Sequence, residues 1–267
     1  AEVIDRHGAD YPVANTFAMG NVDLERLRDY LSEEGMLTQL ANGKKGNKAE
    51  GIIRLGMNLT SKYKDDLDAL GIWGPLTVSL NENELTYVNC TNCRSVDAVN
   101  RDDMTRAEIA LRAQISDTVS FFRRCIPGFE NAYLSRTSPQ IAVRRTRTIV
   151  CEYDISLEDI LEGRGFEDEV ARYGFHDMAP RYMIKDGGDY GIPYRALLPR
   201  GVENLLVAGR MITSDYKAHM STRNTVCCMA QGQAAGTAAA IAALRGMTVR
   251  ELPIKDLQDR LLADDVY

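Results

Sequence analysis

The sequence contains few proline, cysteine, histidine and aromatic residues. Among its 267 residues are 8 Pro, 6 Cys and 3 His, and Phe, Trp and Tyr together make up 7%. Six cysteines are too few for a disulfide scaffold in a chain of this length, so we expect reduced thiols and a cytoplasmic protein. Positive charge is also in short supply, because 32 Lys and Arg face 38 Asp and Glu for a net charge of −6. A mildly acidic chain holds a polyanion only if it gathers its cations locally, so we expect no nucleic-acid partner.

Long apolar runs of the membrane-spanning kind are also lacking. Residues 224–244 carry no formal charge and are numerous enough to cross a bilayer. Ala and Gly dominate this run, however, and it includes Asn224, Gln231 and Gln233. We therefore expect a buried helix of a globular protein and no membrane span. The start of the chain is charged and does not resemble a secretion signal.

The spacing of apolar residues predicts an α+β fold, with a mostly antiparallel sheet and helices followed by one strand–loop–helix unit of the α/β type. Two helices are predicted after capping residues, one after Asp23 and one after the possible capping box at 105–108. The remaining predicted elements are, in chain order, a strand at 13–20, a polar glycine-rich loop at 41–49, a hairpin at 76–80 and 85–90, two strands within 131–153, a short helix from Ser156, an irregular stretch at 162–192, a buried strand at 205–208 and a last helix carrying Ile254, Leu257 and Leu261.

The segment 191–240 is the most informative about function. A wholly apolar strand is predicted to end at Gly209, where the backbone can approach a ligand closely. A loop then returns to a helix that begins near Asn224, whose first amides are free donors at the positive end of the helix dipole. Gly232 and Gly236 flatten one side of this helix. We therefore expect this side to pack closely on the strand. The strand end and helix start would form a crevice for an anionic or electron-rich ligand, although ordinary strand–helix packing explains the pattern equally well.

Three motifs of this segment follow one another as IPYRALLP at 192–199, NLLVAGR at 204–210 and CMAQGQAAG at 228–236. Upstream stand FAMGNVD at 17–23, TRAE at 105–108, PGFENAYL at 127–134, SPQIAVR at 138–144, EDI at 158–160 and GR at 163–164. This series resembles the C-terminal part of the FAD-dependent oxidoreductases and, more distantly, the flavoprotein group of fumarate reductase and succinate dehydrogenase. The order of the motifs agrees over nearly the whole chain.

The resemblance implies an enzyme that transfers hydride or electrons between FAD and a small organic substrate. It implies a substrate domain at 1–190 and the C-terminal element of an FAD-binding domain at 191–267. The flavin ring would contact residues at the strand end and helix start, namely Gly209, Arg210, Asn224, Thr225 and Val226. Arg223 and His219 would act on the substrate beside the ring.

One feature of the family is missing from the sequence. FAD-dependent oxidoreductases begin with a strand, a GxGxxG turn and a helix that hold the ADP half of the cofactor, and no GxGxxG occurs in these residues. The chain therefore resembles a C-terminal portion that starts at Ala1 after processing or cropping. An N-terminal FAD-binding segment, or a separate subunit that provides it, is the expected partner.

Several charged or polar residues permit a structural as well as a functional interpretation. Arg145 and Arg147 are predicted to share one side of a strand, as a solvated or ion-paired face or as a cationic wall near a substrate anion. Tyr194 and Arg195 would bind substrate, or Arg195 would pair with an acid. Arg223 likewise would grip an anion, or pair with an acid such as Asp215.

The pair Cys90 and Cys93 forms a CxxC that would serve as a redox pair, a disulfide or half of a metal site. No second CxxC occurs, so we expect structural thiols and no metal. Two other classes of function stay open at this stage. One is a non-catalytic binding or assembly module that docks on a separate FAD-binding chain, and the other is a metal or redox module at this CxxC.

Overall fold

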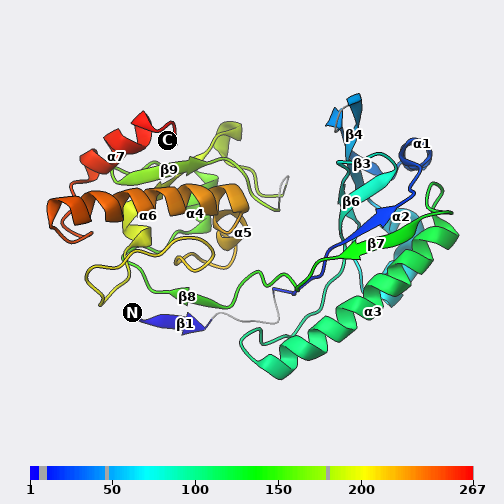
Figure 1. Cartoon of the computed structure of the whole chain (residues 1–267), viewed down its shortest axis with the longest axis horizontal. Helices are drawn as coiled ribbons and strands as arrows, with labels where there is room; N and C mark the ends of the chain where they lie inside the picture. Colours follow the sequence, from blue (N-terminus) through cyan, green and yellow to red (C-terminus); the bar gives the residue numbers. More distant parts are fainter. Residues whose placement is uncertain (6–10, 46–47, 179–180, 267) are drawn as a thin grey trace. The chain divides into compact units, whose positions relative to one another are not determined.

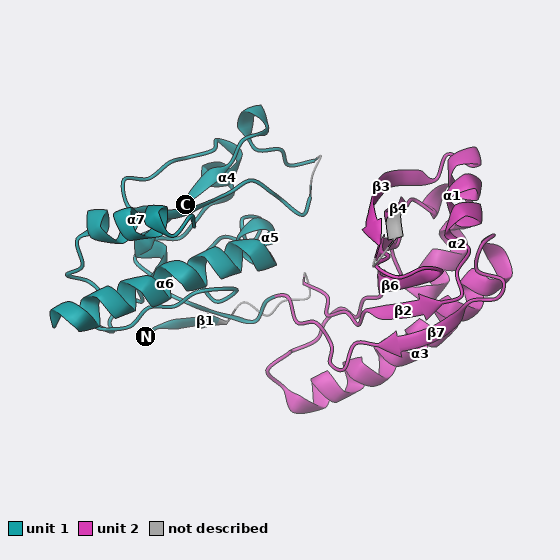
Figure 2. Ribbon diagram, turned by 45° about the horizontal axis from the view of Figure 1, so that its top comes forward, with its two compact units in different colours: residues 1–6, 145–267 teal, residues 7–144 magenta. Residues whose placement is uncertain are grey.

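The computed structural model describes residues 1–5, 11–45, 48–178 and 181–266 (Figure 1). The chain divides into two compact units, one of residues 1–6 and 145–267 and the other of residues 7–144 (Figure 2). We call them unit 1 and unit 2. The domain boundary expected between residues 190 and 191 does not coincide with either boundary between the two units. Strand β9 (Glu169–Tyr173) pairs with β10 (Tyr190–Pro193), so residues on both sides of the expected boundary belong to unit 1.

Unit 2 is built on one six-stranded antiparallel sheet. The strands follow one another in the order β3, β4, β5, β6, β2, β7. Their bounds are β2 Phe17–Gly20, β3 Leu37–Lys45, β4 Lys48–Met57, β5 Leu76–Val78, β6 Glu84–Asn89 and β7 Tyr133–Thr137. Strand β2, which lies between β6 and the edge strand β7, is buried along its whole length.

Three helices accompany this sheet, α1 (Leu24–Glu33), α2 (Thr60–Leu70) and α3 (Arg101–Cys125). The Asp23 side chain caps α1 by accepting from the Arg26 amide at 3.0 Å, as the sequence predicts. Apolar residues of the helices and of the sheet form one buried cluster, which includes Met19, Leu27, Leu31, Leu55, Leu85, Phe121 and Phe122. The predicted hairpin at 76–80 and 85–90 and the helix after Asp23 are thus confirmed.

Two predictions in unit 2 are wrong. The expected polar loop at 41–49 is the end of β3 and the start of β4, except for 46–47, which lie outside the described residues. Helix α3 starts at Arg101 rather than at a capping box at 105–108, because the Asn100 side chain accepts from the amides of Asp102 and Asp103. The Thr105 hydroxyl instead donates to the Arg101 carbonyl inside the helix.

Unit 1 combines two small antiparallel sheets with short and long helices. The first sheet pairs β1 (Val3–Asp5) with β8 (Arg147–Ile149), and the second pairs β9 with β10. Strand β8 is the second of the two strands predicted within 131–153, whereas β1, β9 and β10 were not predicted. The helices are α4 (Leu157–Leu161), two 3₁₀ turns (Lys185–Gly187 and Tyr194–Leu197), α5 (His219–Thr222), α6 (Thr225–Arg245) and α7 (Ile254–Ala263). Helices thus accompany antiparallel sheets in both units, so the predicted α+β class is confirmed in this respect.

The long helix α6 packs on the core of unit 1 through one stripe only. Cys227, Gln231, Ala234, Ala238 and Ala242 are buried, and they follow the spacing of one helix face. The opposite face is apolar but open to solvent, with Val226 65%, Met229 68% and Leu244 88% exposed. The helix was expected to be buried, but the described residues of unit 1 cover only one of its faces. No described helix is long and apolar enough to cross a bilayer.

The predicted strand at 205–208 is absent from the described part of the chain, and so is the packing expected of Gly232 and Gly236. Leu205 is 41% exposed, and the segment is held to unit 1 by the Val207 amide, which donates to the Leu197 carbonyl at 2.9 Å. A Cβ built on either glycine meets no described atom within 4 Å. A groove of about 430 Å³ separates the segment from α6, lined by Asn204, Leu205, Leu206, Ala235, Gly236, Ala239, Ala242, Ala243, Met247 and Val249.

Candidate functional site

The turn at 209–212, here called the Gly209 turn, forms one side of the predicted crevice. Gly209 adopts φ +88°, a conformation that favours glycine, and a Cβ at this position would meet no described atom within 4 Å. Its amide donates to Gln231 Oε1 at 2.7 Å, and its carbonyl accepts from the Ile212 amide at 3.3 Å. Gly209 therefore offers open space to a ligand, while its own N–H group is already used.

The start of α6 forms the other side. Asn224 is the N-cap residue, but its side chain makes no capping bond to a described amide. Its Nδ2 instead donates to the Met220 carbonyl at 3.3 Å. Thr225 and Val226 are exposed at the first turn, where amides lack partners within the helix and the dipole is positive. This end of α6 is therefore able to donate to an anion or a carbonyl oxygen.

Arg223 lies immediately before this helix start. Its side chain is 18% exposed and forms an ion pair with Asp177, which is 25% exposed. The alternative of an ion-paired arginine is thus present, but with an acid other than Asp215. The Asp215 carboxylate instead accepts from the amides of Lys217 and Ala218, at 2.8 Å each.

Cys228, in the first turn of α6, experiences the positive charges of Arg210 and Arg223. Burial raises the pKa of the Cys228 thiol, while the charges of Arg210 and Arg223 act to lower it. The structure links the Gly209 turn to the segment just before α6 through Gln231, which bonds to both Gly209 and Thr222.

His219 is buried behind this group. It begins α5, has no exposed surface, and its backbone amide donates to the Asp215 carbonyl at 3.0 Å. A side chain without exposed surface does not touch a substrate in this arrangement. Its neighbour four residues on, Arg223, is the more accessible of the two.

Tyr194 and Arg195 make their contacts with other segments of unit 1. The Tyr194 hydroxyl donates to the Val249 carbonyl at 2.8 Å, and burial raises its pKa to about 12. Arg195 Nη1 lies 2.7 Å from Asp168 Oδ1, and its guanidinium stacks on the ring of Tyr153 at 4.7 Å. For Arg195 the structure therefore contains the acid partner that the sequence left open as the alternative to substrate binding.

Arg145 reaches the inner side of the site. It is 6% exposed, and its Nη2 donates to the Ser214 carbonyl at 2.6 Å. The Ser214 hydroxyl in turn lies 3.2 Å from the hydroxyl of Thr222, the residue before Arg223. Arg145 is thus a buried cation that supports the loop beside the site.

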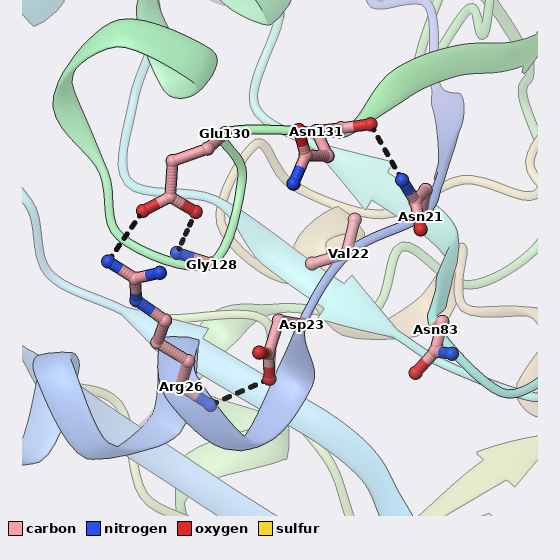
Figure 3. Close-up of a pocket in the computed structure, with 8 residues that line it drawn as sticks. All are labelled: Asn21, Val22, Asp23, Arg26, Asn83, Gly128, Glu130 and Asn131. Atoms are coloured by element: carbon pink, nitrogen blue, oxygen red, sulfur yellow. Dashed lines mark hydrogen bonds and ion pairs between the residues drawn. The ribbon is translucent and has the colours of Figure 1, made fainter.

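A separate polar hollow of about 350 Å³ lies in unit 2, between the start of α1 and the turn at 128–131 (Figure 3). The side chains of Asn21, Asp23, Arg26 and Glu130 are bonded to one another or to nearby backbone groups. Arg26 pairs with Glu130 at 2.9 Å, Glu130 accepts from the Gly128 amide at 2.9 Å, and Asn21 donates to the Asn131 carbonyl at 3.0 Å. These bonds connect the start of α1 to the turn at 128–131, so they support the fold of unit 2.

The sequence matches a known protein family over nearly its whole length. The model of the family described as FAD dependent oxidoreductase matches residues 4–261. The chain belongs to the FAD-dependent oxidoreductase family. Its cofactor is accordingly FAD, and its activity that of an oxidoreductase. No curated protein and no solved structure matched this chain.

The CxxC of this FAD-dependent oxidoreductase lies in unit 2. Cys90 has no exposed surface and burial raises its pKa, while Cys93 is half-buried with a raised pKa. All six cysteines are free thiols. Among the described residues no group of three or more His, Cys, Asp and Glu side chains is arranged to hold a metal ion.

Sequence reasoning missed three residues of the site, Asp177, Thr222 and Gln231. Asp177 pairs with an arginine 46 positions away, and no local pattern marks such a contact. Gln231 did carry a signal, because it lies on the same helix stripe as Cys227 and Ala234 and is the one long polar side chain there. A buried polar residue on an apolar stripe indicates a specific hydrogen-bond partner.

Proposed function

We propose that unit 1 holds the flavin end of FAD between the Gly209 turn and the start of α6, in an enzyme that acts on a small organic substrate. Bound FAD supplies the transfer of hydride or electrons. The chain's own residues bind and orient the cofactor and the substrate. The observation that carries this proposal is the exposed first turn of α6, without a side-chain cap, beside an open glycine turn and two arginines.

The donors and the space at this site fit the flavin ring. The pyrimidine edge of the ring carries carbonyl oxygens, and the amides of Thr225 and Val226 are donors at the positive end of a helix. Gly209 leaves room beside its backbone for a flat ring. Preorganised donors of this kind stabilise negative charge that develops on a bound group.

Arg223 is the residue that we assign to the substrate. Its guanidinium is permanently charged and offers two parallel hydrogen bonds to a carboxylate. The ion pair with Asp177 holds it at the start of α6 while part of its side chain stays exposed. His219 has a positioning role in this proposal, and the contacts of Tyr194 and Arg195 assign them to the fold of unit 1.

We also propose that a further FAD-binding segment or subunit holds the ADP half. No GxGxxG turn occurs among these residues. The uncovered face of α6, with the groove beside Leu205 and Leu206, is an apolar surface of the kind that packs against another layer. The free thiols favour a cytoplasmic location. If the chain proves to have no chemistry of its own, the same surface supports an assembly module that docks on a separate FAD-binding chain.

The test is a titration of the purified chain with FAD and with lumiflavin, which has the ring but lacks the ADP half, followed by flavin absorbance and fluorescence. We expect saturable binding of both with similar affinity. An absence of binding to either would contradict the proposed flavin site. FAD binding tighter by orders of magnitude would contradict the proposal that the ADP half is held elsewhere.

Two arginine variants provide a matched comparison. Arg210→Gln should weaken flavin binding because it removes a charge beside the ring. Arg245→Gln removes the same charge at the far end of α6, where Arg245 pairs with Asp256, and should leave binding unchanged. Equal effects of the two variants would show that only the net charge matters.

A substitution of Arg223 tests the substrate assignment in the FAD-loaded enzyme. Arg223→Lys keeps the charge but loses the planar pair of donors. It should lower kcat/KM by roughly 10²-fold, as misplacement of a positioning group does, while flavin stays bound. Near-normal turnover with a lower Tm would instead identify Arg223 as a structural partner of Asp177.

A further inference from the structure

Gln231 is a buried amide in the middle of an apolar helix face. It has no exposed surface and lies on the stripe of α6 that packs on unit 1. Its Oε1 accepts from the Gly209 amide at 2.7 Å, and its Nε2 donates to the Thr222 carbonyl at 3.0 Å. Nε2 also lies 3.3 Å from the sulfur of Cys227. Both ends of this amide are therefore used.

These two hydrogen bonds join the two sides of the proposed flavin site. Gly209 begins the turn on one side, and Thr222 directly precedes Arg223 and the start of α6 on the other. One uncharged side chain thus connects two backbone segments that are 13 positions apart, since Gly209 and Thr222 differ by 222 − 209 in number. Glycine at φ +88° has a broad choice of conformations, so the turn needs such a tether to keep one of them.

We propose that Gln231 is a positioning residue of the flavin site, which fixes the Gly209 turn relative to Arg223 and the first amides of α6. This inference rests on the proposed function. Gln231 itself lies beneath the surface and touches neither cofactor nor substrate. Its role requires one acceptor and one donor on a neutral side chain of this length.

Three variants of the full chain separate this role from simple packing. Gln231→Met keeps the length of the side chain but removes both hydrogen bonds. Gln231→Glu restores them only when its carboxyl group is protonated, because the neutral acid both donates and accepts. Burial raises the pKa of such a carboxyl group, so the neutral form is favoured at pH 5.5 and the charged form at pH 8.5. Gln233→Met is the control, because Gln233 is exposed on the same helix.

Two measurements are made on each variant. The first is amide hydrogen exchange at 209–212 and 222–226 in the chain without flavin, and the second is FAD affinity by fluorescence titration. We expect Gln231→Met to speed amide exchange at both segments and to weaken FAD binding about tenfold. A loss of this size corresponds to the free-energy cost of leaving a buried polar group without a hydrogen bond. Gln233→Met should change neither. Gln231→Glu should match the wild type at pH 5.5 and approach Gln231→Met at pH 8.5.

The outcomes distinguish this inference from the proposed function. If the wild-type chain binds FAD and Gln231→Met binds it equally well, the positioning role is refuted. If the wild-type chain binds no flavin, the proposed site fails, and the exchange data alone then decide whether Gln231 fixes the Gly209 turn. If Gln231→Met does not fold, a Gln231→Glu variant without the expected difference between the two pH values refutes the inference.

Discussion

Replacing the two glycines of α6 by alanine should stabilise the isolated chain. Both lie in a helix interior, where glycine costs about 0.8–1.0 kcal/mol relative to alanine. A Cβ at Gly232 or Gly236 meets no described atom within 4 Å, so no packing penalty opposes this gain. We expect about 1 kcal/mol from each substitution and about 2 kcal/mol from both together, which corresponds to a rise in Tm of about 4–8 °C.

Thermal unfolding followed by circular dichroism, together with urea unfolding, measures this effect. Two controls bracket the expected gain. Ala240→Gly, on the exposed side of α6, should cost the same amount that each glycine substitution gains. Gly209→Ala should destabilise, since φ +88° is strained for any residue with a Cβ. A loss of stability in Gly236→Ala would refute the reasoning, because it would mean that this face of α6 is already covered, as the sequence predicted.

Three further predictions concern burial and titration. Gly128→Ala should destabilise unit 2 by about 1–3 kcal/mol in urea unfolding, because φ is +96° and the new Cβ would lie 2.7 Å from the Asp23 carbonyl oxygen; an unchanged midpoint would contradict the strained turn. In alkylation at pH 8 by iodoacetamide, followed by mass spectrometry, Cys228 should react before the fully buried Cys90, whose raised pKa suppresses the thiolate; the reverse order would be evidence against this burial. Burial lowers the pKa of His176, so the folded state binds its proton less readily than the unfolded state and stability should fall as the pH drops below about 6.5. The difference in unfolding free energy between pH 7.5 and pH 5.5 should shrink in His176→Asn, and an equal difference would exclude His176 as its source.

Local signals in the sequence were sufficient for several elements. The carboxylate of Asp23 caps α1, and Ser156 forms a capping box with Asp159 at the start of α4. Helix α7 buries Leu257 and Leu261, as their spacing predicts. These elements depend on groups three or four residues apart, which a sequence pattern shows directly.

The elements that failed depend on partners far along the chain. An apolar run such as 205–208 becomes a strand only if another strand pairs with it, and the described residues provide none. The polar residues at 41–45 do form a strand, because β4 pairs with β3 and is itself paired to β5. Tertiary pairing therefore overrode local propensity in both directions.

In the candidate site, too, local features could be predicted from the sequence and long-range contacts could not. The motif around Gly209 and the helix start at Asn224 were predicted to form one crevice, and Gln231 connects these two segments by bonding to Gly209 and Thr222. The ion pair of Arg223 with Asp177 and the hydrogen bond between Gly209 and Gln231 join positions that are far apart in the chain. No local sequence pattern indicates such contacts, so they could not be predicted.

The insertion of unit 2 within unit 1 sets an order of folding during synthesis. Unit 2 is one continuous stretch, and near its two ends the Ala14 and Ala142 backbones form a β-bridge, with the Ala142 amide 2.6 Å from the Ala14 carbonyl oxygen. Strand β1, by contrast, pairs Val3 with Ile149, so its partner is made nearly 150 residues later, after the whole of unit 2. Unit 2 is therefore able to fold as a nascent domain while β1 is still single. Unit 1 is completed only after residues 145–266 have been made, so β1 lacks its partner strand while unit 2 is synthesised.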